Sequence, residues 1–493
     1  MRSRSTSLGR GLVWFRNDLR IQDNSALYHA GKRCEQLAAV FIACPDSWQS
    51  HNEGDALVAF RMACLHELQT QLQTRNIPLY FLQLSTFSQV PQALEQITRR
   101  LKIETVFANA EYPLNEQRRD HAVRDRLREN GVAAEYHSDR TLLPPGAVRT
   151  GAGEPYKVFT PFKRALIQLC AESEIKPLPV PRKKPLPKEG AHWPKWLALE
   201  LEENKKLTQK IPEHLPHFAI DTAKSGIVKG WKSGEKAAQK RLKLFSERIS
   251  GYQAERDFPA LDSTSHLSPY LNCGAISIRQ CMQMALNLNQ GHWQSGNAGI
   301  SCWISELIWR DFYTHLLVDF PHLSKGQPFK AETDQIPWRY DKDLFCRWSR
   351  GETGVPIVDA AMRQLNEIAW MHNRLRMVVA SFLSKNLLID WRWGERYFMQ
   401  HLIDGDFASN NGGWQWTAST GTDAAPYFRV FNPYSQSQRF DPNGDFIRRY
   451  VPELDSLNNK EIHDPPSMAN YPSVICDVGA GRKRAIEVFS NLK

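Results

Sequence analysis

Short apolar runs alternate with amphipathic stretches over the first 140 residues. The runs are rich in β-branched and aromatic residues and lie at 11–15, 37–45, 77–83, 105–112 and 133–137. Between them lie segments whose apolar positions recur three and four residues apart, as in helices that bury one face: 56–74, 91–102 and 116–131. This alternation predicts an α/β fold in which a doubly wound parallel sheet carries helices on both faces.

The remainder of the chain has a different pattern. From about residue 226 to the end, the apolar spacing is helical and predicts a large all-α domain. Residues 143–225 show no clear period, and 176–190 are rich in Pro and Lys, which favours an exposed, extended chain. We therefore expect an N-terminal α/β domain, a long connector that wraps the surface, and a C-terminal helical domain, at 1–142, 143–225 and 226–493.

Composition limits the partners that this chain can have. Lys and Arg number 63 against 53 acids, a net charge of +10, which fits an anionic partner such as nucleic acid or, equally, a generic soluble surface. No apolar run approaches the length of a membrane span, and the N-terminus lacks the apolar stretch of a signal peptide, so we expect a cytoplasmic protein. The nine cysteines have no CxxC or zinc spacing, so neither a metal nor a disulfide framework is expected.

Two segments of the helical part carry polar residues among apolar ones. Glu306, Trp309 and Arg310 lie three and four residues apart and share a helix face. That pattern fits a carboxylate beside an aromatic ring in a pocket, or a surface Glu–Arg pair. Asn373 and Met377 also share a face, and the apolar run after Met377 predicts burial. A buried Asn needs a partner, which a ligand, a water or another side chain could supply.

Residues 404–416, "DGDFASNNGGWQW", suggest a bound heterocycle. Asp404, Asp406 and Asn410 offer carboxylates and an amide, which suit alternating N–H and C=O groups better than a metal. If the segment is helical, Trp414 and Trp416 point to nearly opposite sides. These residues predict a ring-shaped cofactor inside the helical domain, with aromatic and basic residues above it.

Long motifs make the sequence similar to the photolyase/cryptochrome family, and within it to the bacterial class I enzymes that repair cyclobutane pyrimidine dimers. The matching segments, in order, are "VWFRNDLRIQDNSAL" (13–27), "LPPGAV" and "YKVFTPFK" (143–163), "RDFPALDSTSHLS" (256–268), "ISELIWRDFY" (304–313), "TGVPIVDAAMRQL" (353–365), "WMHNRLRM" (370–377) and "DGDFASNNGGWQWTASTGTDAAPYFR" (404–429).

The resemblance implies that the helical domain binds FAD. The residues implied to hold its phosphates and ribityl chain are Tyr252, Thr264, Ser265, Leu267 and Ser268. Asp404 and Asp406 would accept hydrogen bonds from the flavin edge, and Arg376 would pair with Asp404. Asn410 matches the family position that faces flavin N5.

The same resemblance implies roles in catalysis, electron transfer and DNA binding. The implied catalytic residues are Glu306, Asn373, Met377 and Asn410. The implied DNA-binding residues are Arg256, Trp309, Arg310, Arg374, Trp416 and Arg429. Trp338, Trp391 and Trp414 match a chain that carries electrons from the surface to oxidised flavin, and ordinary core packing is the alternative for these three.

The family also suggests an antenna pigment on the N-terminal domain. The match at 114–120 implies 5,10-methenyltetrahydrofolate, with Asn115, Glu116 and Lys325 as contacts, although relatives use a deazaflavin or no antenna. The function implied is light-driven splitting of pyrimidine dimers in DNA by a monomer without an obligate protein partner. The alternatives are a blue-light receptor that signals through a partner, and an electron-transfer flavoprotein that binds only small molecules.

Overall fold

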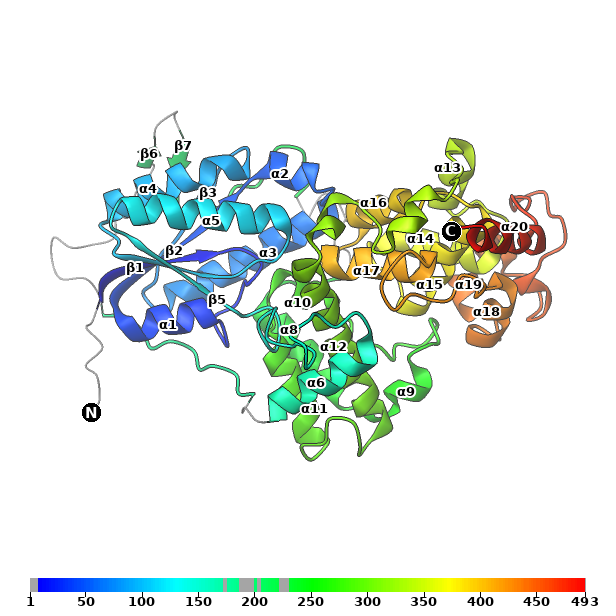
Figure 1. Ribbon diagram of the computed structural model, residues 1–493, viewed down its shortest axis with the longest axis horizontal. Helices are drawn as coiled ribbons and strands as arrows, with labels where there is room; N and C mark the ends of the chain where they lie inside the picture. The colour runs from blue at the N-terminus through cyan, green and yellow to red at the C-terminus, as the bar shows by residue number, and fades with distance from the viewer. Residues whose placement is uncertain (1–7, 172–174, 186–198, 202–204, 221–229, 493) are drawn as a thin grey trace. The chain divides into compact units, whose positions relative to one another are not determined.

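The computed structural model describes residues 8–171, 175–185, 199–201, 205–220 and 230–492 (Figure 1). The chain divides into two compact units. The first unit comprises Met1–Val148, Ala165–Ser246 and Ser265–Trp293, and the second comprises Arg149–Arg164, Glu247–Thr264 and Gln294–Lys493. The boundaries at 142 and 225 stay a prediction.

A parallel five-stranded sheet forms the centre of the first unit. Its strands are β1 (Leu8–Phe15), β2 (Cys34–Ala43), β3 (Leu79–Gln83), β4 (Thr105–Asn109) and β5 (Ala133–His137). They lie in the order β3-β2-β1-β4-β5, and every neighbouring pair is parallel. Each of the five expected strands is present, so the α/β prediction is confirmed. The order reverses between β1 and β4, where open α/β sheets usually place a functional crevice.

Helices cover both faces of this sheet, as Figure 1 shows. The principal ones are α1 (Ser25–Arg33), α3 (Asp55–Gln73), α4 (Val90–Leu101) and α5 (Leu114–Glu129). Alternate residues of β1, such as Leu12 and Trp14, share a core cluster with Leu94 of α4 and Val123 of α5. This follows from the two-residue period of a strand, which sends successive side chains to opposite faces. The other elements are α2 (Pro45–Ser50), η1 (Phe87–Gln89), β6 (Leu199–Leu201), β7 (Lys205–Leu207), α8 (Glu235–Ser246), α10 (Ser268–Cys273) and α11 (Ile278–Leu288).

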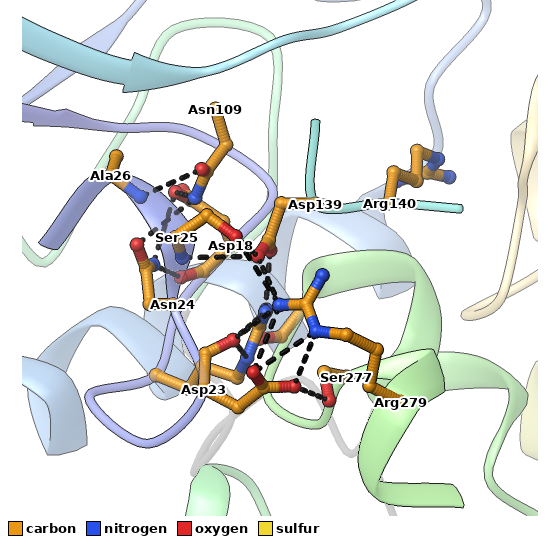
Figure 2. A network of polar contacts seen from close by, with 12 residues as sticks. Asp18, Asp23, Asn24, Ser25, Ala26, Asn109, Asp139, Arg140, Ser277 and Arg279 are labelled. Carbon is orange, nitrogen blue, oxygen red and sulfur yellow. Dashed lines mark hydrogen bonds and ion pairs between the residues drawn. The ribbon is translucent and has the colours of Figure 1, made fainter. Parts of the chain in front are cut away.

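A buried polar network joins α11 to the carboxyl ends of β1 and β4 within the first unit (Figure 2). Arg279 Nη2 donates to Asp139 Oδ1 at 2.7 Å, and its Nε donates to both carboxylate oxygens of Asp23 at 3.0 Å. Asn109 Nδ2 donates to Asp18 Oδ2 at 2.7 Å. Burial alone would raise the pKa of Asp139, but the charges of Arg20 and Arg279 outweigh it and hold that pKa low. The motif "FRNDLRIQDNSAL" therefore has a structural role in this unit.

The second unit is helical, as expected. Its helices are α9 (Tyr252–Glu255), α12 (Ala298–Asp319), α13 (Lys342–Arg350), α14 (Pro356–Ile368), α15 (Asn373–Ser381), α16 (Trp391–His401), α17 (Phe407–Ala418), α18 (Pro433–Phe440), α19 (Asp445–Tyr450) and α20 (Val478–Ser490). A π-helix, η6 (Phe382–Asn386), follows α15, and the 3₁₀ turns are η3 (Ile249–Gly251), η4 (Pro321–Lys325), η5 (Ala331–Gln335), η7 (Pro452–Leu454) and η8 (Glu461–His463).

Residues 356–404 form three α-helices, α14, α15 and α16, with the π-helix η6 after α15. Ala369 and Leu388 take positive φ angles of 55° and 56°, and these turns end α14 and precede α16. The residues after Met377, Val378 to Ala380, are buried as predicted. One large core cluster of α13 to α20 includes Trp338, Trp348, Trp391 and Trp414.

The expected connector contains a helix that the sequence pattern did not predict. α6 (Phe159–Ala171) carries Pro161 in its first turn, where proline is tolerated but hides a helical pattern. The basic stretch 176–190 is also more than a solvated linker, because Lys184 Nζ donates to the Gly31 carbonyl oxygen at 2.7 Å. Parts of the connector, 172–174, 186–198, 202–204 and 221–225, lie outside the described residues.

Candidate active site

A buried ion pair joins α15 to the turn before α17. The Asp404 side chain is 3% exposed, and Arg376 Nη2 donates to its two carboxylate oxygens at 3.0 and 2.8 Å. Arg376 Nε donates to the Met371 carbonyl oxygen at 2.9 Å, so the guanidinium is fixed from both sides. The pairing that the resemblance implied is therefore present. A charge buried in this way needs its partner, because an unpaired one would be strongly destabilising.

Asp406 starts α17 as its N-cap. Its Oδ2 accepts from the Ser409 backbone N–H at 3.2 Å and from the Ser409 hydroxyl at 2.6 Å. This cap explains how a segment of turn-forming Asp, Asn and Gly residues begins a helix. In the helix, Trp414 is buried at 3% exposure and Trp416 is only half-buried, as expected for residues two apart.

Asn410 is oriented by a residue that the sequence analysis missed. Its Nδ2 donates to the Glu395 backbone carbonyl oxygen at 2.9 Å, so the side-chain oxygen of Asn410 is left to accept from a ligand. The Glu395 carboxylate itself accepts from Asn411 Nδ2 at 2.8 Å. Burial raises the pKa of Glu395 to about 7. The sequence did contain a signal for Glu395. It is an acidic residue between Trp391 and Phe398, on the face of a predicted helix that is otherwise apolar.

The raised pKa of Glu395 predicts how stability depends on pH. Between pH 4.5, the ordinary pKa of a glutamate, and about pH 7, the folded state binds more protons than the unfolded state. Protonation of Glu395 therefore stabilises the folded state fully below pH 4.5, and this contribution is lost as the pH rises through 7. Glu395→Gln keeps an acceptor for Asn411 and carries no charge. We expect it to raise the free energy of unfolding by at most about 3 kcal/mol near pH 8. Thermal melts should show this gain shrinking to zero near pH 4, and a gain of equal size at both pH values would contradict the assignment.

Glu306 and Trp309 on α12 each have a close partner. Arg256 Nη1 donates to Glu306 Oε1 at 2.6 Å, and the Glu306 side chain remains 33% exposed. Trp309 stacks on Phe159 with ring centroids 3.6 Å apart and planes 8° apart. One face of the indole is therefore covered by α6. Phe159 is a second residue that the sequence analysis missed.

Asn373 is exposed, which corrects the expectation that it is buried. It is the first residue of α15, one turn ahead of the apolar residues that are buried. Met377 is partly buried on the same face. Asn373 therefore needs no internal partner, and its amide can contact a ligand that reaches this end of α15.

Of the candidate DNA-binding arginines, two pair with carboxylates, one is exposed and one is half-buried. Arg256 pairs with Glu306, and Arg374 Nη2 donates to Asp257 Oδ2 at 2.7 Å. Burial disfavours the charge of Arg256, but the hydrogen bond to Glu306 outweighs it and raises the pKa of Arg256. Arg429 is exposed, and its side chain has no partner among the described residues. Arg310 is half-buried on α12.

The three tryptophans of the implied electron chain share one core. Trp338, Trp391 and Trp414 are 7%, 1% and 3% exposed. A Cβ added at Gly394 would lie 2.1 Å from Trp414 Cη2, so this indole packs on α16 one turn after Trp391. A parallel β-bridge between Arg339 and Ile389 brings the segment of Trp338 beside the residues that precede Trp391. The segments that carry the three tryptophans therefore lie near one another, and the electron chain stays a prediction.

The implied antenna contacts are engaged in part. Asn115 Nδ2 lies 2.9 Å from His51 Nε2, and Glu116 Oε1 lies 3.5 Å from His51 Nδ1. Burial opposes a charge on His51, but Glu116 outweighs it and raises the pKa of His51. Glu116 Oε2 is buried and has no hydrogen-bond partner among the described residues. Lys325, in the second unit, is exposed at the end of η4.

Comparison with known proteins identifies the family. A model of DNA photolyase matches residues 11–183, and a model of the FAD binding domain of DNA photolyase matches residues 303–491. The deoxyribodipyrimidine photo-lyase of Vibrio cholerae is 44% identical over 488 residues, 98% of this chain and 99% of that protein. This chain belongs to the DNA photolyase family.

Solved photolyases have the same fold. A bacterial class III photolyase from Agrobacterium tumefaciens superposes with a TM-score of 0.85 at 34% identity, covering 100% of this chain and 99% of the other. An archaeal photolyase from Sulfolobus tokodaii, solved with two FAD molecules, gives a TM-score of 0.80 at 28% identity, covering 98% of this chain and 100% of the other.

The residues of this chain fit FAD. Thr264, in the loop implied to hold the phosphates, has a buried hydroxyl oxygen without a hydrogen-bond partner among the described residues. A Cβ at Gly413 would meet no heavy atom within 4 Å, whereas one at Gly412 would lie 2.2 Å from Tyr313. Gly413 lies one turn after Asn410, so α17 presents an open face that a flat ring can approach. Of the other implied contacts, Tyr252 is buried in α9, and Ser265, Leu267 and Ser268 belong to the first unit.

Proposed function

We propose that this protein is a light-dependent deoxyribodipyrimidine photo-lyase that splits cyclobutane pyrimidine dimers in DNA. The observation that supports this most is the fixed amide of Asn410 beside the Arg376–Asp404 pair, on a chain whose relatives carry that enzyme's name. Reduced FAD, when bound, supplies one electron to the dimer under blue light and recovers it after the ring opens. The side chains around it bind and orient the dimer and exclude water.

A dimer must leave the base stack to reach a buried cofactor, which costs a few kcal/mol and least at a damaged site. Trp309 and Trp416 can offset this cost, because stacking contributes about 1–3 kcal/mol per base. Phe159 holds the Trp309 ring in place at 3.6 Å, so one indole face remains for the dimer. This arrangement favours bases that are already poorly stacked, which contributes to specificity for damage.

Glu306 and Asn373 are positioned for the polar edge of the dimer. Arg256 fixes one oxygen of Glu306, which leaves the other for the substrate. The exposed amide of Asn373 can donate to a carbonyl oxygen on which negative charge develops. Preorganised groups of this kind stabilise a charged intermediate because they need not reorient as it forms. Met377 contributes an apolar contact on the same helix face.

Glu306→Ala should separate binding from repair. It removes a group that acts on the charged intermediate and releases Arg256, which adds an unpaired positive charge near the DNA. We expect affinity for dimer-containing DNA to stay equal or rise, while repair per absorbed photon falls severalfold. Quantum-yield measurements at saturating DNA check this, and an unchanged yield would remove Glu306 from the mechanism.

Arg429→Ala should weaken binding of dimer-containing DNA through a lost phosphate contact. Arg429 is exposed and its side chain has no partner among the described residues, whereas Arg256 and Arg374 are held by carboxylates. Each phosphate contact contributes about 0.9 to the slope of log affinity against log salt. We expect the variant to lose about that much slope in fluorescence titrations between low and high salt. A variant with wild-type slope would show that Arg429 does not meet phosphate.

We also infer that Asn115 and Glu116 contact a folate antenna, whereas the role of Lys325 stays a prediction from the resemblance. The support is the unpartnered Glu116 Oε2, which could accept from the N–H edge of a pterin. The Sulfolobus photolyase, solved with two FAD molecules, offers a flavin as the other candidate pigment. Absorbance of the pigment released from purified protein distinguishes the two.

The setting that we infer for this enzyme is the cytoplasm, where it acts on DNA as a monomer without an obligate protein partner. Among the described helices, none is long and apolar enough to cross a membrane. No group of three potential metal ligands occurs within the described part of the chain.

The proposal is tested by incubating the reduced holoenzyme with an oligonucleotide that contains one thymine dimer. We expect the dimer to disappear under blue light and to persist in the dark. Undamaged oligonucleotide should bind more weakly than the damaged one. Tight binding without loss of the dimer in light would favour a receptor over a repair enzyme.

A further inference from the structure

The helices that carry the two proposed stacking tryptophans, α12 and α17, lie against each other and run antiparallel. A Cβ at Gly412 of α17 would lie 2.2 Å from Tyr313 Cδ1 of α12. One turn further along α12, Leu317 belongs to an apolar cluster with Ala408, which lies one turn before Gly412 in α17. The contact thus advances along one helix as it recedes along the other, which is the mark of antiparallel packing.

Trp309 and Trp416 continue this series in the opposite direction. Trp309 lies one turn before Tyr313, and Trp416 lies one turn after Gly412. Both indoles are half-buried. The antiparallel packing therefore brings them to the same end of the two helices, where a flipped dimer can enter the space between them, the dimer slot.

The loop 419–425, which follows α17, is tied to the Trp416 wall of the dimer slot. The Ala425 backbone N–H donates to the Trp416 carbonyl oxygen at 3.1 Å, and the Gly421 N–H donates to the Gln415 carbonyl oxygen at 3.0 Å. The loop therefore folds back on the last turn of α17 and is held to the residue that forms this wall.

The same loop is tied to the Trp309 wall. Asp423 Oδ2 accepts from the Phe159 backbone N–H at 3.0 Å, and the Thr422 hydroxyl donates to the Lys157 carbonyl oxygen. The N–H groups of a first helical turn have no partner within their helix, so Asp423 caps α6 from a distant part of the chain. The Phe159 ring in turn stacks on Trp309, with ring centroids 3.6 Å apart.

The charge of Asp423 is not one that DNA binding would favour. Asp423 is exposed and lies in the same segment as Arg429, which is proposed to contact phosphate. A carboxylate on such a surface repels phosphate and lowers the affinity for DNA. Asp423 also takes a φ of 46°, in the left-handed region that most residues avoid. Its cap on α6 gives a reason for an acid at this position.

We propose that Asp423 is a positioning residue that sets the width of the dimer slot, and with it the preference of the enzyme for damaged DNA. This inference rests on the proposed function, which assigns Trp309 and Trp416 to the dimer. The loop 419–425 holds Trp416 directly. Asp423, in that loop, holds Phe159, and Phe159 holds Trp309. One loop thus fixes both walls of the slot.

A slot of fixed width suits a dimer better than a single base. The two pyrimidines of a dimer are joined through saturated ring carbons, so their planes are inclined and each ring presents one outer face. Two indoles at a fixed spacing can meet both outer faces at once, whereas a single flipped base reaches only one indole. Because both walls are in place beforehand, little affinity is lost to ordering them. A mobile wall would reduce this advantage for the dimer.

The test compares Asp423→Gly with Asp423→Asn in the reduced, FAD-loaded enzyme. Glycine adopts a positive φ without strain but has no acceptor for the Phe159 N–H. Asparagine tolerates the same φ and keeps a side-chain oxygen for that hydrogen bond. Both substitutions remove the charge, so both should bind undamaged DNA more tightly, by a similar factor.

The measured quantity is the ratio of the affinities for an oligonucleotide with one thymine dimer and for the undamaged oligonucleotide, titrated in the dark. We expect Asp423→Gly to lower this ratio by up to about fivefold, the equilibrium factor of a typical lost helix cap. Asp423→Asn should keep the wild-type ratio. Asp423→Gly should also need more DNA than Asp423→Asn for half-maximal repair. Repair per absorbed photon at saturating DNA should be the same in both, because Asp423 is assigned no contact with the dimer.

Phe159→Leu tests the same connection at its next residue. It keeps the N–H that Asp423 caps and an apolar side chain, but it removes the ring that stacks on Trp309. We expect this variant also to lower the affinity ratio. It should not bind undamaged DNA more tightly, because it removes no charge.

The outcomes separate this inference from the proposed function. A wild-type ratio in Asp423→Gly or in Phe159→Leu would overturn the inference and leave the proposed function intact. So would an equally lowered ratio in Asp423→Gly and Asp423→Asn, because the loss of charge would then explain the effect. A wild-type enzyme that binds both oligonucleotides equally would overturn the proposed function and the inference together. A ratio lowered in Asp423→Gly and Phe159→Leu but not in Asp423→Asn would support the inference.

Discussion

Trp338→Phe is expected to abolish light-driven reduction of oxidised FAD and to leave repair by chemically reduced enzyme almost unchanged. Trp338 is the most exposed of the three tryptophans of the implied electron chain, at 7%, and phenylalanine is much harder to oxidise than tryptophan. The substitution keeps an aromatic ring, so the packing loss should be well below the roughly 3–5 kcal/mol of a Trp→Ala change in a core. Flavin absorbance under illumination, with an external reductant present, measures the effect.

Trp416→Ala is the matched control and should show the converse. Trp416 is half-buried on α17 and is proposed to stack on the dimer, so its loss should weaken binding of damaged DNA by about 1–3 kcal/mol. Photoreduction should persist in this variant. If Trp338→Phe photoreduced at the wild-type rate, the three tryptophans would be ordinary core residues and the chain through Trp391 would be wrong.

Of the proposed substitutions, Asp404→Asn is expected to lower the free energy of unfolding most, and it should also release FAD. The carboxylate is 3% exposed and receives two hydrogen bonds from Arg376, whose charge would be left without a partner. Breaking a buried pair from one side costs about 3–5 kcal/mol. Thermal melts and the ratio of flavin to protein absorbance after purification measure both effects.

Asp406→Asn, two positions along the chain, controls for the change of residue type. Asn serves as an N-cap nearly as well as Asp, so its hydrogen bonds to Ser409 can persist. We expect a loss of stability below about 1 kcal/mol. If Asp404→Asn and Asp406→Asn lost the same stability, the Arg376–Asp404 pair would contribute no more to stability than the N-cap of Asp406 does.

The sequence pattern predicted the fold wherever one period dominated. All five strands were visible as short apolar runs, and helices α3, α4 and α5 as three-to-four spacing. α6 was missed because Pro161 lies in its first turn and because Phe159 gains its partner, Trp309, only in the folded chain. The breaks at Ala369 and Leu388 could not be predicted from the sequence, because neither residue type signals a positive φ angle.

The candidate site was predictable in its residue types but not in its pairings. The Arg376–Asp404 pair could be inferred from the family resemblance. The pairs of Arg256 with Glu306 and of Arg374 with Asp257 join residues 50 and 117 positions apart, which no local pattern reveals. Asn373 was expected to be buried because its helix is apolar, but it occupies the exposed first position. Glu395 gains its importance from burial, which depends on neighbouring helices.

The central claim is that the electron given to the dimer returns, so that repair consumes light but no reductant. The direct measurement is a multiple-turnover reaction without oxygen or added reductant, in which dimers lost and flavin absorbance are recorded together under blue light. The account predicts many dimers split per enzyme while the flavin stays reduced, and none split in the dark. Dimer loss that stops at one per flavin, with the flavin oxidised in step, would contradict it.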